Sequence, residues 1–511
     1  MAILRKAANA LIGGFLVALL GGAGGAYAQQ KQLTLCWAAW DPANALVELS
    51  KDFTAKTGVQ MKYEFIPWPS FAERILADLN IQGKKCDLLI GDSQWIGTAA
   101  TKGHYVNLTE FFEKNGVKME DFSPATVEGY STWPKGSKNY WALPAMGDAV
   151  AWTYRKDWFA RTDIQQEFKV KHGRDLEPPK TWAELKEVGL FFQNRKIDGK
   201  RVYGAAIYTE RGSEGITMGA TAAMYANGMR YDNPKQAYDL KGYINGKAAV
   251  DALGAYKDFY ACCTPPGHSN AYMSEDLDSY LAGQVAMQMN FIAFFPGIAK
   301  DLNVGGEKTG FFVNPAMGAA GTSLGGQGLS VIKYSDKQEL ALEYVKWFAD
   351  AKVQQQWWDL GGFSCHTAVL NKPGFGQSKP YAAVFLESMK IAKDFWQEPS
   401  YIALLAAMQK RIHDYVVIGT GSSQEAMDQL LADWSPVFAA QGVLKAAISD
   451  AQVAPSIFNT DASKDITKWV PIILFLLLAI AGVAIFIRSR SRRIGYASPA
   501  SKQVNLSSGK K

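Results

Sequence analysis

Residues 32–91 read QLTLCWAAWDPANALVELSKDFTAKTGVQMKYEFIPWPSFAERILADLNIQGKKCDLLIG, and this stretch decides the fold. Strand-like apolar segments alternate in it with segments whose apolar residues recur at helical spacing. In chain order these are strand 32–40, helix 43–57, strand 61–66, helix 70–81 and strand 86–91. Strands that alternate with helices form a parallel sheet with crossover helices, so the sequence predicts an α/β lobe here.

A second α/β region follows. Residues 149–154, 202–208 and 285–291 are apolar and strand-like, and Thr181 with Glu184 three positions later forms a capping box that predicts a helix start. Later, a strand at 328–333 precedes a helix at 336–351, and the chain is mainly helical to about residue 440. The region between the two chain ends is too long for one core, so we expect two lobes.

The first 28 residues have the pattern of a secretory signal peptide. Arg5 and Lys6 precede an apolar, glycine-rich run over residues 7–23, and the small-x-small sequence Ala26-Tyr27-Ala28 follows. We expect cleavage after Ala28. An uncleaved anchor would need a longer and more apolar run.

Residues 469–487, WVPIILFLLLAIAGVAIFI, carry no charge and are long enough to cross a bilayer. An arginine cluster begins directly after them at residue 488, whereas the charges before them are balanced. The positive-inside rule then places the basic tail, residues 488–511, in the cytoplasm. We therefore expect residues 446–468 to form a stalk that ties an exported protein to the membrane.

The exported region is not basic. The whole chain has a net charge of +6, but the two ends hold nine Lys and Arg residues and no acidic residue, so residues 29–468 have a net charge of −3. This charge gives no support to nucleic-acid binding, and the basic tail suits anionic lipid headgroups.

Cysteine and histidine patterns indicate neither a disulfide-built scaffold nor a metal or cofactor site. Five cysteines are too few and too scattered for such a scaffold, although one disulfide is expected outside the cytoplasm. We expect it to join Cys262 or Cys263 to another partner, while adjacent cysteines can also be buried as small apolar residues. The spacings do not resemble a zinc site.

Nine segments, taken in chain order, carry a family resemblance. They are WDP at 40–42, FTAKTGVQMKY at 53–63, CDLLIGDSQW at 86–95, GHYVNLTEF at 103–111, YWALPAMGDAVAWTYRKDWF at 140–159, PPKTWAELKE at 178–187, YLAGQVAMQMNF at 280–291, GGQGLSVIK at 325–333 with ALEYVKWF at 341–348, and SSQEAMDQL at 422–430. Together they resemble the extracellular solute-binding proteins of bacterial ABC transporters, in the carbohydrate-type, maltose-binding-protein-like group. Cys86 stands where the family usually has proline, and a C-terminal membrane anchor is unusual for it.

The resemblance implies a two-lobe periplasmic-binding-protein fold of type II, with a hinge and a ligand cleft. The first lobe would comprise residues 29–145 and 315–350, and the second residues 146–314 and 351–445. It also implies no catalysis, a sugar or polyol as ligand, and the transmembrane subunits of an ABC permease as partners, at the periplasmic face of the membrane. Lobes of this kind close on a ligand that contacts both of them.

Ligands of open parallel sheets bind beyond the carboxyl ends of the strands, where aromatic and acidic residues are frequent in this chain. Strands of the first lobe end before residues 40–41, 67–69 and 91–95, and those of the second before 208–211 and at 290–291. The resemblance adds two further candidate segments. They are the glycine pair at 325–326, where the chain returns to the first lobe, and residues 396–399, which match a segment that often carries an aromatic residue over the bound sugar. The candidate ligand-binding residues are Trp40, Asp41, Trp68, Asp92, Asp148, Asn290, Gly326 and Trp396.

Purely structural roles are the alternative to these assignments. Most tryptophans pack in cores, Asp41 could be a helix N-cap, Asp92 could accept loop hydrogen bonds, and Arg211 could form a surface pair with Glu214. Three other functions also remain open at this point. They are a glycosidase with a carboxylate pair, a membrane-tethered ligand sensor, and a binder of polyamines or other small solutes, for which the aromatic and acidic residues would serve equally well.

Overall fold

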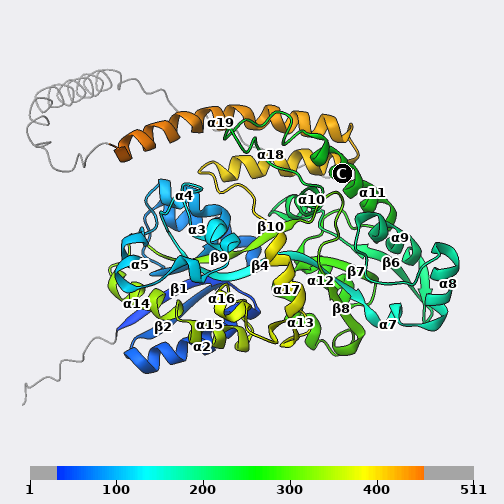
Figure 1. The fold of residues 1–511 in the computed structure, drawn as a ribbon, viewed down its shortest axis with the longest axis horizontal. Coiled ribbons are helices and arrows are strands. Elements are labelled where there is room, and N and C mark those ends of the chain that lie inside the picture. Colours follow the sequence, from blue (N-terminus) through cyan, green and yellow to red (C-terminus); the bar gives the residue numbers. More distant parts are fainter. Residues whose placement is uncertain (1–30, 454–511) are drawn as a thin grey trace, which may run out of the picture. The chain divides into compact units, whose positions relative to one another are not determined.

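A single sheet runs through both lobes in the computed structural model, which describes residues 31–453 and the side chains of residues 31–440. Its strand order is β2-β1-β3-β9-β4-β7-β6-β5, with β8 paired to β4 and β10 paired to β9. The two central strands, β4 (Leu143–Arg155) and β9 (Thr322–Val331), run antiparallel to each other. The chain passes between the lobes along these two strands (Figure 1).

The first lobe contains the predicted parallel strands. β1 (Gln32–Ala38) lies between β2 (Gln60–Ile66) and β3 (Leu88–Asp92) and is parallel to both. Crossover helices α2 (Asp41–Thr57) and α3 (Trp68–Asn80) cover opposite faces of this sheet (Figure 1). The other helices of this lobe are α4 (Ile96–Thr101), α5 (Thr109–Asn115), α6 (Pro124–Tyr130), α14 (Gln338–Phe348), α15 (Ala351–Leu360) and α16 (Thr367–Leu370), with short helical turns η1 (Ser93–Trp95), η2 (Met119–Asp121) and η5 (Phe375–Gln377).

The second lobe is built on β7 (Val285–Phe291), which is antiparallel to β4 and parallel to β6 (Lys200–Ala206). The predicted helix start at Thr181 is confirmed, because its hydroxyl accepts the Glu184 N–H as the N-cap of α9. The remaining elements are β5 (Arg195–Ile197), β8 (Thr309–Phe312), α7 (Lys156–Phe159), α8 (Thr162–His172), α9 (Trp182–Phe192), α10 (Gly215–Ala226), α11 (Lys247–Cys263), α12 (Met273–Leu281), α13 (Phe295–Lys300), η3 (Ile292–Phe294) and η4 (Gly306–Lys308).

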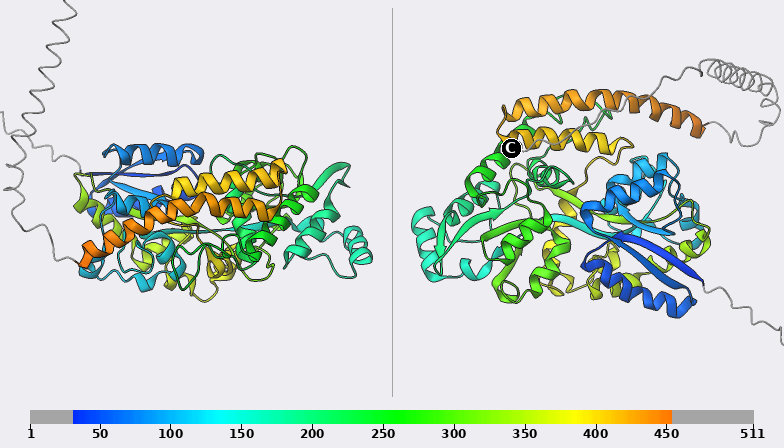
Figure 2. Two further views of the ribbon diagram at one scale, coloured as in Figure 1. Left: turned by 90° about the horizontal axis from the view of Figure 1, so that it is seen from above. Right: turned by 180° about the vertical axis from the view of Figure 1, so that it is seen from behind.

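Elements near the end of the described chain join both lobes. α17 (Ala382–Ile391) packs over β4, where Phe385 lies against Gly147, and β10 (Ala392–Lys393) then pairs with the start of β9. α18 (Tyr401–His413) packs on α10 of the second lobe and continues into the π-helical turn η6 (Asp414–Ile418). The first part of α19 (Ser423–Val453) lies beside α18, since Trp434 Nε1 donates to the Leu404 carbonyl (Figure 2).

Two segments depart from the predicted lobe boundaries. Ala316, predicted to begin the return to the first lobe, still pairs with Thr181 of the second lobe. α15, predicted in the second lobe, packs on α2 of the first, and its Trp357 lies 6.2 Å from Trp37 of β1 between ring centroids. The crossing is therefore within β9 itself, and the helix that follows α14 stays in the first lobe.

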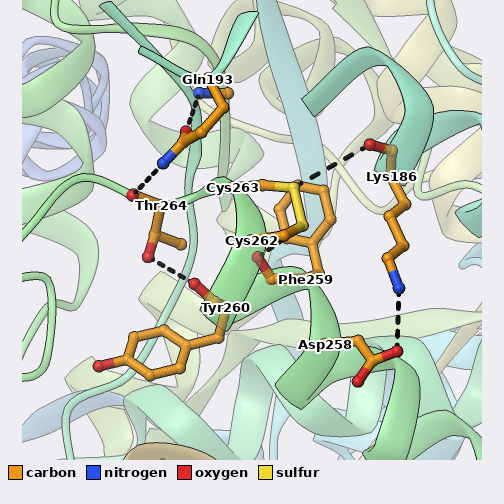
Figure 3. Close-up of a disulfide and its surroundings, with 9 residues drawn as sticks. Lys186, Gln193, Asp258, Phe259, Tyr260, Cys262, Cys263 and Thr264 are labelled. Carbon is orange, nitrogen blue, oxygen red and sulfur yellow. Dashed lines mark hydrogen bonds and ion pairs between the residues drawn. A yellow bond between two sulfur atoms is a disulfide. The ribbon is translucent and has the colours of Figure 1, made fainter. Parts of the chain in front are cut away.

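The disulfides differ from the expected pairing. Cys36 of β1 is bonded to Cys86, just before the neighbouring strand β3, with the two Cα atoms 5.7 Å apart. Cys262 and Cys263 are bonded to each other at the end of α11 (Figure 3). The expectation that one of them joins a distant partner was wrong, because each is bonded to its neighbour in the sequence and Cys365 is buried elsewhere in the fold. Cys365 is buried and free.

Several sequence predictions fall outside residues 31–453. These are the signal peptide 1–28, the membrane span 469–487, the cytoplasmic tail 488–511 and the part of the stalk after residue 453; residues 446–453 belong to α19. Among residues 31–453, no helix combines the length and the apolar character needed to cross a bilayer.

Candidate ligand-binding cleft

A cleft lies where the crossing strands meet the loops of both lobes. Its lining consists of Trp40, Trp68, Asp92, Gln94, Asp148, Glu214, Met218, Met273, Phe291, Leu324, Gly325, Gly326 and Gln327. The first lobe contributes the loops after β1, β2 and β3, the second contributes α10, α12 and the end of β7, and β4 and β9 form the floor. The loops that follow strands therefore converge here, as the rule for open α/β sheets predicts.

The cleft is nearly closed in this structure. Its lining atoms enclose about 310 Å³, mouth included, but the free volume for a water-sized particle is about 20 Å³. That is room for one ordered water. A ligand the size of a sugar therefore needs the lobes or the lining side chains to move apart before it enters.

Two stacked indoles form the apolar wall of the cleft. Trp40 and Trp68 lie 5.6 Å apart between ring centroids with planes inclined by 24°. Trp37 packs edge-on against Trp40 from the core, and Phe294 of the second lobe approaches Trp40 at 6.5 Å. The Trp40 Nε1–H is buried and has no partner among the described residues. The wall thus offers a flat apolar face with one unused donor.

Asp92 is positioned by its place at the carboxyl end of β3. Its Oδ1 accepts from the Gln94 N–H at 3.0 Å, which starts the turn η1, and from the Ser93 hydroxyl at 3.4 Å. The side chain is buried, and burial raises the pKa of this carboxyl to about 7 despite both hydrogen bonds. Asp92 therefore accepts hydrogen bonds within its own loop, as considered above, and it also lines the cleft.

Asp148 lies on β4 at the passage between the lobes. Its Oδ1 accepts from the Ala149 N–H at 2.8 Å and from the Ala293 N–H of η3 at 3.1 Å. It is 1% exposed, and burial raises the pKa of this carboxyl to about 8. Asp148 therefore holds the end of β7 against β4 and also lines the cleft.

Glu214 is the ionisable cleft residue that was not among the sequence-based candidates. It directly precedes α10, is buried, and its Oε1 accepts from the Tyr401 hydroxyl of α18 at 2.6 Å. Burial first, and then the charge of Asp92, raise the pKa of this carboxyl well above its usual range. The surface pair with Arg211 considered from the sequence is not formed. The sequence placed the loop after β6 near the cleft. It did not indicate Glu214 itself, whose hydrogen-bond partner Tyr401 lies 187 residues further along the chain.

Two amide side chains complete the polar lining. Gln94 and Gln327 are each 2% exposed, and the Oε1 atom of each is buried without a partner in the described structure. Next to Gln327, Gly326 has φ +101°, and a side chain there would overlap the Met146 carbonyl and the Tyr130 ring. Only glycine fits this position of the cleft floor.

Three candidates do not line the cleft. Asp41 is exposed on the first turn of α2, without a capping bond. Asn290 is fully buried, because its Oδ1 accepts from Tyr208 and its Nδ2 donates to the Met273 carbonyl, so it positions cleft residues from behind. Trp396 packs in an aromatic cluster with Tyr231 and Phe438. Asn290 therefore lies near the cleft, as its position in the sequence predicted, but its side-chain amide is hydrogen-bonded within the second lobe.

The chemistry of the lining is that of an acceptor-rich binding site. No Lys, Arg or His lines the cleft, and within residues 31–440 no group of three or more His, Cys, Asp or Glu side chains could hold a metal ion. The two indoles supply flat apolar contact, while three carboxyl groups and two amides surround them. A small molecule rich in hydrogen-bond donors matches this arrangement.

The comparisons with known proteins agree with the two-lobe architecture. The sequence pattern that describes a bacterial extracellular solute-binding protein matches residues 39–355. A probable amino-acid ABC transporter periplasmic-binding protein of Sinorhizobium fredii is 20% identical over 355 residues, which are 68% of this chain and 75% of that protein. The diacetylchitobiose-binding protein of Streptomyces coelicolor is 23% identical over 322 residues, 60% of this chain and 66% of that protein.

Solved structures show the same fold. Maltose-bound MalE3 of Thermotoga maritima has a TM-score of 0.67 at 19% identity, with 80% of this chain and 99% of that chain covered. An ABC transporter solute-binding protein of Agrobacterium radiobacter in complex with ribitol has a TM-score of 0.65 at 20% identity, covering 80% and 98%. At these identities the likeness establishes the α/β two-lobe fold.

Proposed function

The chain belongs to the bacterial extracellular solute-binding protein family, and we propose on this basis that it captures a sugar or polyol and delivers it to an ABC permease. Members of the family bind solutes outside the cytoplasm and are not enzymes, so the chain is a binding protein and not a glycosidase. The observation that carries the proposal is the pair of stacked indoles beside buried acceptors in the cleft.

The cleft chemistry suits a polyhydroxylated ligand. A sugar ring presents apolar C–H faces, which fit the flat surface of Trp40 and Trp68, and a rim of hydroxyl groups that donate to carboxyl and amide oxygens. Gln94 Oε1 and Gln327 Oε1 are buried without partners, and an unmet buried acceptor costs free energy until a donor reaches it. A bound ligand with several hydroxyl groups supplies those donors.

Closure follows from where the contacts originate. Trp40, Trp68 and Asp92 belong to the first lobe, whereas Glu214 and Phe291 belong to the second. A ligand that contacts both sets stabilises the closed form by the difference between its affinities for the closed and open forms. Because the free volume of the cleft is small in this structure, entry of a ligand requires the lobes or the lining side chains to move apart.

A membrane tether is the second part of the proposal. The apolar residues 469–487, with arginines after them, would hold the protein at the periplasmic face of the membrane after cleavage of residues 1–28. Tethering confines a binder to the surface where the transmembrane subunits of a permease lie, which raises its effective concentration there.

A thermal-shift screen of the purified full-length protein against sugars and polyols tests ligand capture. A ligand that binds only the folded protein raises the melting temperature in a concentration-dependent way. Replacing Trp68 by Ala should abolish the shift, whereas the matched variant Trp347→Ala, far from the cleft lining, should lose stability but keep a shift. Absence of any shift across the screen contradicts the proposal.

Delivery is tested in cells. If the protein serves an importer, deleting the genes of the permease that it serves should abolish uptake of the radiolabelled ligand found in the screen. Uptake that persists without the permease, together with an intact thermal shift, would identify a tethered sensor instead.

A further inference from the structure

Three carboxyl groups from three segments gather at one side of the cleft, and we call them the carboxyl cluster. Asp92 comes from β3 of the first lobe, Glu214 from the start of α10 in the second lobe, and Asp394 from the segment that follows β10. Asp92 and Glu214 line the cleft, whereas Asp394 is outside the lining, and its Oδ2 lies beside Gly129, next to the lining residue Leu324. Burial first, and then the charge of Asp92, raise the pKa values of both Glu214 and Asp394 well above their usual range.

No cation balances the carboxyl cluster within residues 31–440. Among the described residues, none of its three members forms an ion pair with Lys, Arg or His, and their hydrogen-bond partners are neutral. Glu214 accepts from the Tyr401 hydroxyl, Asp394 accepts from Gln397 Nε2 at 3.3 Å, and Asp92 accepts from the Gln94 N–H. Buried carboxylates are normally paired with a cation, so this cluster lacks a positive partner.

Unused acceptors in the same place point to a ligand that supplies donors. The Asp394 Oδ1 atom is buried without a partner, and so are Gln94 Oε1 and Gln327 Oε1 of the cleft lining. Gln94 and Gln327 are each more than nine-tenths buried. An ammonium group carries three donors and no acceptor, so it can supply the donors that these buried oxygens lack. The indole faces of Trp40 and Trp68 are also favourable surfaces for a cation.

We propose that the ligand carries a protonated amine, which is bound beside Asp92 and Glu214. This inference rests on the proposed function of the cleft as a solute-binding site and narrows its substrate class to amino sugars, amino polyols or polyamines. The ammonium group bridges the first and second lobes through Asp92 and Glu214. Its positive charge favours the ionised form of both carboxyl groups, and its contacts with them hold the two lobes together.

Matched pairs of probes distinguish an amine from a hydroxyl at the same position. Binding of the full-length protein is measured by calorimetry with D-glucitol against D-glucamine, glucose against glucosamine, and galactose against galactosamine, with spermidine as a further probe. We expect at least one amine to bind roughly tenfold or more tightly than its hydroxyl counterpart, because hydrogen bonds to charged groups are the stronger ones. Binding of spermidine alone supports the ammonium site and assigns the polyamine source.

Two other outcomes overturn the inference in different ways. If a neutral sugar or polyol binds as tightly as its amine counterpart, the inference is wrong and the proposed function stands. If no sugar, polyol or amine binds, the proposed function fails together with the inference.

A charge-removing variant tests the assigned residues. Glu214→Gln keeps the acceptor for the Tyr401 hydroxyl and removes the charge. We expect it to weaken amine binding roughly tenfold or more and to change binding of the neutral counterpart less than about threefold. Glu307→Gln, the same change at an exposed position of the second lobe, should alter neither affinity. Equal losses for amine and neutral probes, with melting temperature unchanged, would contradict the assignment of Glu214.

Discussion

The two ends of strand β3 carry buried aspartates in opposite circumstances. Asp87, just before the strand, accepts from the Thr34 N–H at 2.8 Å, the Ser335 hydroxyl at 2.6 Å and Lys337 Nζ at 2.9 Å. Asp92, at the other end, has only the Ser93 and Gln94 donors and no cation. Asp87 is satisfied by the protein itself, whereas Asp92 keeps capacity for a group from outside. The difference separates an aspartate that stabilises the fold from one that is available for binding.

The largest change in stability is expected from removing Asp87, whose hydrogen-bonding capacity is satisfied by the protein itself. Replacing Asp87 by Ala leaves Lys337 and two neutral donors without their acceptor, and we expect the free energy of unfolding to fall by roughly 3 kcal/mol. Urea unfolding of the full-length protein measures this change. A loss below about 1 kcal/mol would show that water replaces the carboxylate easily and that the two ends differ less than the hydrogen bonds indicate.

Stability should decrease as pH rises from about 6.5 to 8.5 in the ligand-free protein. The unfolded carboxyls are fully ionised in this window, while burial raises the pKa values of Asp92 and Asp148 to about 7 and about 8. The folded state therefore holds protons that the unfolded chain has released, and losing them costs roughly 2 kcal/mol over the window. Urea midpoints at several pH values measure the slope, and the double variant D92N/D148N should make it shallower, with the contribution of Glu214 retained.

Replacing Asp92 by Asn sharpens the comparison because stability and binding should move in opposite directions. Asn keeps an acceptor for the Gln94 N–H but carries no charge to desolvate, so we expect the ligand-free protein to gain roughly 1 kcal/mol at pH 8. The same variant should bind the ligand from the thermal-shift screen more weakly. Destabilisation by this substitution would show that Asp92 is structural, like Asp87.

The smallest effect is expected at an exposed ion pair near Asp87. Lys84 and Asp336 are 2.7 Å apart, with both side chains more than half exposed. Exposed ion pairs contribute little, so Asp336→Asn should change the free energy of unfolding by less than about 0.5 kcal/mol. A larger change, measured by the same urea titration, would indicate that Asp336 supports Lys337 and hence Asp87.

Local patterns in the sequence were sufficient to predict the α/β fold and much of the cleft. Loops at the carboxyl ends of strands correctly located Trp40, Trp68 and Asp92 at the cleft, because strand order and direction follow from short-range periodicity. Whether these residues bind the ligand stays a prediction.

Side-chain partners from distant segments could not be predicted. Glu214 is buried and accepts from the Tyr401 hydroxyl, and Trp396 packs on Phe438 outside the cleft lining. Asn290 was correctly placed near the end of β7, yet Tyr208 and Met273 use its amide. The Cys36–Cys86 bridge needed the pairing of β1 with β3, which sequence spacing does not give.

The continuity of β4 and β9 has a consequence for how the lobes separate. These strands pair with each other from Leu143 to Ala149, and each also pairs with strands of one lobe, β9 with β3 and β4 with β7. Opening can then occur as a change of twist along one antiparallel ladder, with every interstrand hydrogen bond retained. Loading and release of a solute would require no local unfolding, and the amides of this ladder should exchange with solvent equally slowly in the empty and the loaded protein.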